Sequence, residues 1–179
     1  MQLNLNKNGV YLCVMSEQRP TFDTFLGYFK EQELPVALTE ESLSEFQQIN
    51  DPLPIPVIHA YLLGEDEELD AFSEIVPCFK IPETHDFHAV VCWKGELMKY
   101  QFFLVTFDNK GNPIASAAIA GIASDGKTVL RSVATIEPDW NIYIVEGEQE
   151  ATGDMYAPTQ STAHQMELLP TGEITIKED

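Results

Sequence analysis

The chain has 179 residues, and 29 Asp and Glu against 10 Lys and Arg give it a net charge of −19. This charge repels nucleic-acid phosphates and anionic membrane surfaces, so we expect neither as a partner. The 44% hydrophobic and 10% aromatic content is typical of a globular protein and argues against global disorder. The length fits one domain, 1–179, with a mainly helical part at 1–75 and a mainly sheet-forming part at 76–177.

The N-terminal stretch does not have the pattern of a targeting signal. Its apolar run, Val10 to Met15, is too short and too weakly flanked for a secretory signal, and no stretch of the chain reaches the roughly 18 apolar residues of a membrane span. The three cysteines, Cys13, Cys78 and Cys92, are odd in number, so they cannot form a complete disulfide framework. Reduced thiols are typical of a reducing compartment, and we predict a cytoplasmic protein.

Two helices are predicted before residue 50. The first carries an apolar stripe at helical spacing, with Thr21 as its N-cap; the stripe consists of Phe22, Phe25, Leu26 and Phe29. After an extended step at Leu34-Pro35, a second short helix is expected from Thr39. Its apolar positions are Leu43, Phe46 and Ile49.

A proline-rich connector and an acidic run follow. Three prolines within residues 51–56 exclude a helix interior there, and Val57 to Leu63 fits either a short third helix or a buried strand. The next six residues hold five carboxylates: Glu65, Asp66, Glu67, Glu68 and Asp70. They lack the alternating ligands and central glycine of a calcium-binding EF-hand, so a solvated loop or helix start is expected.

From Ile75 onward the pattern changes to that of strands. Aromatic and β-branched residues fill Val76 to Ile81, His88 to Trp93 and Tyr100 to Phe107, with turns expected at Trp93-Lys94-Gly95-Glu96, Asp108 to Gly111 and Asp125-Gly126. Tyr100 to Phe107 is apolar on both faces, which predicts a central strand. Pro113 to Ile122, rich in Ala and Gly, fits a strand or a helix, and the turns on either side favour the strand.

Two segments resemble parts of uncharacterised bacterial proteins. They are Phe103 to Ile114, which reads FLVTFDNKGNPI, and the helix at Phe22 to Phe29 followed by Leu34-Pro35. The resemblance implies a bacterial source and a similar fold. It implies no activity, because none is assigned to those proteins.

The sequence contains few patterns of catalytic or metal sites. There is no phosphate-binding Gly-x-Gly-x-x-Gly or Walker sequence and no Gly-x-Ser-x-Gly elbow, so we expect no cofactor. Two thiols and two imidazoles within fifteen residues are zinc-ligand types: Cys78, His85, His88 and Cys92. Their spacing differs from the close ligand pairs of zinc fingers, and Cys92 lies in an apolar strand, so we predict no metal site here.

These observations predict an α+β fold, with two or three N-terminal helices packed on a C-terminal antiparallel meander of about six or seven strands. The absence of catalytic motifs favours a binding protein over an enzyme, and the charge favours a basic protein partner, as in an antitoxin-like or immunity-like role. The predicted contact residues lie in the two densest acidic segments, which we expect on one side: Glu65, Asp66, Glu67, Glu68, Asp70, Glu146, Glu148, Glu150 and Asp154. The alternative is an enzyme or small-ligand-binding protein with a pocket between helices and sheet.

Overall fold

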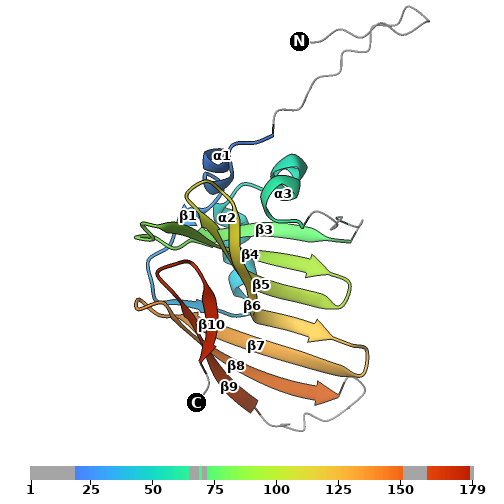
Figure 1. The fold of residues 1–179 in the computed structure, drawn as a ribbon. Coiled ribbons are helices and arrows are strands. Elements are labelled where there is room, and N and C mark those ends of the chain that lie inside the picture. The colour runs from blue at the N-terminus through green and yellow to red at the C-terminus, as the bar shows by residue number, and fades with distance from the viewer. Residues whose placement is uncertain (1–18, 65–68, 70–71, 151–160, 178–179) are drawn as a thin grey trace, which may run out of the picture.

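The computed structural model describes residues 19–64, 69, 72–150 and 161–177. Within these residues three short helices accompany ten strands of one mixed sheet (Figure 1). The helices are α1 (Phe22–Leu26), α2 (Ser42–Ile49) and α3 (Ile55–Tyr61). The strands are β1 (Lys30–Glu31), β2 (Val36–Leu38), β3 (Glu74–Lys80), β4 (Phe87–Glu96), β5 (Lys99–Asp108), β6 (Pro113–Ser124), β7 (Thr128–Ile136), β8 (Asn141–Glu150), β9 (Ser161–Leu168) and β10 (Ile174–Lys177).

The predicted α+β fold class is wrong, because the described chain is mostly β-structure. It has more strands than the predicted six or seven, and two of them, β1 and β2, lie in the part expected to be helical. These strands are two and three residues long, too short to show a period of two. Their partners are distant in the sequence: Lys30 pairs with Phe79 in parallel, and Val36 pairs with Ile136 antiparallel.

The sheet follows the order β1-β3-β4-β5-β6-β7-β8-β9-β10, with β2 paired to β7 outside this path. Strand β6 pairs with β5 along most of its length but with β7 only through Gly121 to Ser124. The far end of β7 pairs with β2 instead, so the sheet divides into an upper part and a lower part (Figure 1). Gly121 marks the division: its φ is +129°, and a Cβ there would lie 2.1 Å from the carbonyl oxygen of Tyr100.

The first hydrophobic core, which we call the inner core, lies between the two parts of the sheet and is closed by β2 and α2. Phe102 and Leu104 of β5 belong to this core together with Ile142 and Ile144 of β8, and Phe46 of α2 packs its ring against Phe79 at 5.5 Å between centroids. Thr106, fully buried, connects the β9–β10 turn to β5, because its hydroxyl donates to the carbonyl of Gly172 at 2.6 Å. The inner core therefore depends on contacts between distant segments.

The second core, which we call the outer core, lies on the opposite face of β3, β4 and β5. Side chains alternate along these strands, so Val91 faces the inner core while Val90 faces the outer core. Helices α1 and α3 cover the outer core (Figure 1). Its centre is an aromatic group in which Phe25 stacks on Tyr61 at 4.9 Å and meets Phe107 at 5.4 Å.

Several local expectations are confirmed. Thr21 is the N-cap of α1, since the Thr24 amide donates to its hydroxyl at 3.2 Å, although the helix ends at Leu26. The antiparallel hairpins around residues 109–111 and at Asp125-Gly126 form as predicted. The two open alternatives are decided: Pro113–Ser124 is a strand, and Ile55–Tyr61 is a helix. The turn placed at Lys94-Gly95 is wrong, because β4 continues through Glu96.

Candidate binding groove at the edge of strand β3

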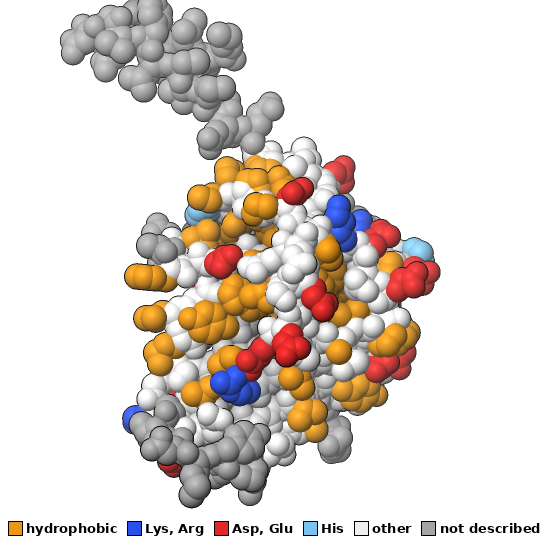
Figure 2. Space-filling view, turned by 180° about the vertical axis from the view of Figure 1, so that it is seen from behind, with side chains coloured by type: hydrophobic (Ala, Val, Ile, Leu, Met, Phe, Trp, Pro, Cys, Tyr) orange, Lys and Arg blue, Asp and Glu red, His pale blue; other side chains and the backbone are white. Residues whose placement is uncertain are grey.

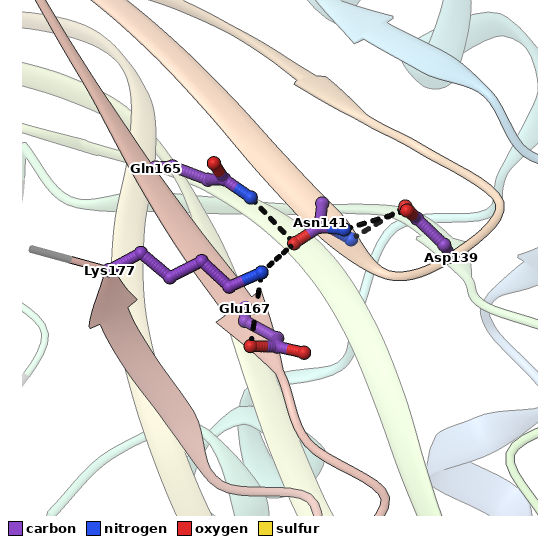
Figure 3. A network of polar contacts seen from close by, with 5 residues as sticks. All are labelled: Asp139, Asn141, Gln165, Glu167 and Lys177. Atoms are coloured by element: carbon purple, nitrogen blue, oxygen red, sulfur yellow. Dashed lines mark hydrogen bonds and ion pairs between the residues drawn. The ribbon is translucent and has the colours of Figure 1, made fainter. Parts of the chain in front are cut away.

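The two outer edges of the sheet differ in how their backbone groups are covered. At one edge β10 is fixed by a polar network centred on Asn141, whose side-chain oxygen accepts from Gln165 and Lys177, each at 2.7 Å (Figure 3). Lys177 also forms an ion pair with Glu167 at 3.2 Å. A lysine on a short edge strand discourages pairing with another chain. The other edge belongs to β3, whose cover is less complete.

Three different partners meet the outer edge of β3 along its length. Strand β1 pairs with its last residues, Phe79 and Lys80. In the middle, the side-chain amide of Asn50 donates to the carbonyls of Pro77 at 3.0 Å and Cys78 at 2.7 Å. At the first residues of β3, from Glu74 to Val76, no strand of the described chain pairs on this side. Among the described residues, the edge is therefore unpaired at one end only.

Asn50 follows α2 directly, and its position there is fixed by three hydrogen bonds. Its side-chain nitrogen Nδ2 also donates to the carbonyl of Phe46, at 3.2 Å, within the last turn of α2. With this nitrogen facing three carbonyls, the side-chain oxygen is buried and has no hydrogen-bond partner among the described residues. Pro77 has no backbone N–H, so it cannot donate to a neighbouring strand. Asn50 takes the place of such a strand here, because its side chain donates to the carbonyls of Pro77 and Cys78.

A groove of about 640 Å³ runs along the open part of this edge. Its described lining comes from three sources: the end of α2 and the following connector (Gln47, Asn50, Pro52, Leu53), α3 (Ile55, Ile58, His59), and the start of β3 with the residues before it (Leu69, Ser73, Glu74, Ile75, Val76, Pro77). Figure 1 shows α3 on one side of β3 and α2 behind the sheet. The groove is therefore a cleft between two helices with a strand edge at its base.

The groove is mainly apolar, and its exposed wall includes Ile55, which is 63% exposed. His59 and Glu74 are the titratable residues of its described lining, and both are exposed. The described lining contains no Lys or Arg. Both side chains are exposed to solvent, so neither is enclosed by the walls of the groove.

A second, smaller hollow of about 430 Å³ lies near the opposite end of β3. Three carboxylates and a tryptophan line it: Glu31, Glu33, Glu83 and Trp140. Glu31 is already paired with Lys80 at 3.2 Å, and Trp140 packs edge-on against Phe87. Two of the four lining groups therefore already have partners within the protein, and we treat the hollow as part of the surface.

The four zinc-type residues are separated by the fold. Cys78 lies in the inner core and Cys92 in the outer core, on opposite faces of the sheet. Burial raises the pKa of Cys78 well above its usual range and that of Cys92 to about 12. His85 lies in an exposed loop, and His88 meets Phe22 edge-on at 5.4 Å. No group of three or more potential ligands among the described residues is arranged to hold a metal ion.

The predicted acidic contact residues are only partly described. Three of them lie on β8: Glu146, Glu148 and Glu150. The Glu146 carboxylate accepts from the Thr162 hydroxyl at 3.4 Å, and its Oε1 lies 3.9 Å from Nδ1 of His164. The other predicted residues lie outside the described residues: Glu65, Asp66, Glu67, Glu68, Asp70 and Asp154. That the two acidic segments share one side therefore stays a prediction.

The β3 groove lies between helices and sheet, where the alternative hypothesis placed a pocket, but none of its lining residues was predicted. The one signal that could have indicated it is Pro77, because a proline inside a strand pattern is typical of an edge. None of the helices in the described ranges is long and apolar enough to cross a bilayer. No protein family model, curated protein or solved structure matches the chain, so the function is argued from the groove itself.

Proposed function

We propose that the protein is a protein-interaction module of the bacterial cytoplasm, and that the β3 groove holds a segment of its partner. The observation that supports this most directly is the open strand edge at the base of an apolar cleft. Exposed apolar surface is costly to leave in water, and an unpaired strand edge offers backbone groups for pairing, so partners commonly cover such sites. The cytoplasmic setting rests on the odd number of cysteines, which is typical of reduced thiols.

The charge of the chain supports a basic partner. On the face shown in Figure 2, acidic side chains lie in several places between hydrophobic ones, and basic side chains are few. A net charge of −19 attracts a cationic partner over a distance, which raises the association rate more than the final affinity. An antitoxin-like or immunity-like role is one form of this proposal. The association rate of the protein with such a partner is expected to fall as salt rises beyond about 0.15 M, where the screening length is about 8 Å.

A small-molecule site is the second candidate, because about 640 Å³ falls within the size range of ligand pockets. This candidate predicts convergent polar groups that would orient a ligand. Of the polar residues in the described lining, Gln47, His59 and Glu74 are exposed, and the side-chain nitrogen of Asn50 already donates to three carbonyls. A peptide segment makes better use of an apolar wall and a strand edge.

The proposal is tested by selecting peptides from a random display library on the intact protein. The matched variants are Ile55→Asp, which places a charge in the groove, and Ile49→Asp, on α2 outside its lining. The two isoleucines are similarly exposed, at 63% and 52%. Selected peptides are expected to bind the wild type and Ile49→Asp equally and to bind Ile55→Asp at least tenfold more weakly. Failure to select any peptide, or equal loss of binding in both variants, overturns the proposal.

A further inference from the structure

We infer that the β3 groove binds its partner by strand addition: an extended, positively charged segment of the partner pairs with the backbone of Ile75. The inference rests on the proposed function and states how that function is carried out. Strand addition is a general mode of peptide recognition in which main-chain hydrogen bonds provide affinity and side-chain contacts provide specificity.

The direction of the Ile75 backbone follows from its neighbours. The carbonyl of Pro77 points away from β4, because it accepts from Asn50 on the outer side. Backbone groups in a strand alternate in direction with a period of two, and the pairing of β3 with β4 is regular from Glu74 to Pro77. The amide and carbonyl of Ile75 therefore point outward too, into the groove that Ile75 lines.

The chain itself already uses this edge for pairing. Strand β1 adds to β3 at Phe79 and Lys80 through only two residues, and the Gln32 amide donates to the carbonyl of Lys80 at 3.1 Å. A short segment is thus sufficient to pair with β3. Asn50 blocks the edge between the two places, which confines an added strand to the neighbourhood of Ile75.

The two walls of the groove define the side chains that such a strand should carry. The side chain of Ile75 lies in the outer core with Ile58 of α3, whereas α2 belongs to the inner core on the opposite face. Side chains of an added strand alternate between these two faces. Those directed at α3 meet Ile55 and Ile58 and should be apolar. Those directed at α2 meet Gln47 and Asn50 and should be small or polar.

Charge complementarity identifies the ends of the segment. Glu74 is exposed beside Ile75, the described lining has no cation, and the chain carries a net charge of −19. An extended segment of alternating apolar and polar residues with flanking lysines or arginines therefore suits the groove. An acidic segment of the same pattern would be repelled.

The test uses the full chain and the synthetic peptide Lys-Lys-Val-Thr-Val-Thr-Val-Lys-Lys. By NMR, amide hydrogen exchange at Ile75 is expected to slow at least tenfold on saturation, whereas Val76, whose amide faces β4, provides the internal control and keeps its rate. The same peptide with glutamates in place of lysines should bind at least tenfold more weakly. No binding of the lysine peptide up to about 1 mM, or binding without slower exchange at Ile75, overturns the inference.

Backbone N-methylation separates strand addition from binding through side chains alone. Two derivatives are needed, one methylated at the central Val and one at a neighbouring Thr. Only one of these amides points toward β3, so one derivative should lose binding at least tenfold while the other retains it. Equal binding of both overturns strand addition. The proposed function would still stand in that case if the display selection on the wild type and Ile55→Asp succeeded.

Discussion

The two cores on opposite faces of the sheet are built differently. The inner core is enclosed by sheet on two sides, and its members come from every strand from β2 to β9. The outer core is covered by α1 and α3, helices of five and seven residues that are too short to be stable alone. Aromatic contacts hold these helices in place, among them Phe25 with Tyr61 and with Phe107.

This difference indicates which part of the molecule opens more easily. Opening the inner core requires the separation of strands that are paired over many residues. Opening the outer core requires only that a thin helical layer detach from the sheet, and regions with few ladder hydrogen bonds usually have the lowest local stability. The groove has α3 as one wall, so it belongs to the more easily opened side.

The largest effect should come from truncating a large ring in either core. Phe102→Ala in the inner core and Phe25→Ala in the outer core each remove a fully buried ring, at a cost of about 3–5 kcal/mol. We expect Phe102→Ala to lower amide protection in α3 and β8 alike, and Phe25→Ala to lower it mainly in α1 and α3. Hydrogen exchange measures both. Equal loss in β8 for the two variants would show that the cores open as one unit.

A smaller loss is expected from Thr106→Val. The substitution keeps the shape but removes the hydroxyl that donates to Gly172 and accepts from the Ala115 amide at 3.0 Å. Leaving these buried groups unpaired should cost about 1–3 kcal/mol, measured by urea denaturation. Thr106→Ser retains the hydroxyl and provides the control. A loss in Thr106→Ser as large as in Thr106→Val would mean that packing, and not the hydrogen bonds, closes the inner core.

The two buried thiols report on the two cores separately. Both have pKa values raised by burial, so a thiol reagent reacts with each one only when its core opens. In a Cys13→Ser background, Cys92 should react about tenfold faster than Cys78, a difference of about 1.4 kcal/mol in opening free energy. Mass spectrometry of peptides around each cysteine gives both rates. Faster reaction of Cys78 would reverse the order of opening.

The smallest effect concerns His88, at the border of the outer core beside Phe22. Burial, and then Lys80, lower the pKa of His88 below 6.5, while Asp23 opposes them. The unfolded chain therefore binds a proton more readily than the folded one, so stability is full above about pH 6.5 and falls as the pH drops below it. The variant His88→Gln should lose less stability than the wild type between about pH 7 and pH 5. If the denaturation midpoint shifts equally with pH in the wild type and in His88→Gln, this histidine makes no contribution.

The features predicted from the sequence are those that neighbouring residues determine. The Asp108 carboxylate accepts from the amides of Lys110 and Asn112, and hydrogen bonds from Asn112 lower its pKa. Asp125 accepts from the Lys127 and Thr128 amides in the next hairpin. Each turn is closed by residues at most four positions apart, so its sequence alone indicates the structure. The cap at Thr21 is local in the same way.

The fold class and the groove required contacts that no local pattern contains. The sequence by itself determined the charge, the hairpin turns, the cap of α1 and the change of period near Ile75. Only the tertiary structure decided that β1 and β2 join the sheet and that Cys78 and Cys92 face different cores. It also decided that Asn50 covers part of β3, while no strand of the described residues pairs with Ile75 on the outer side. The physical reason is distance along the chain: Asn50 and Pro77 are brought together by the packing of α2 on β3, and the energy of that packing is shared among many residues.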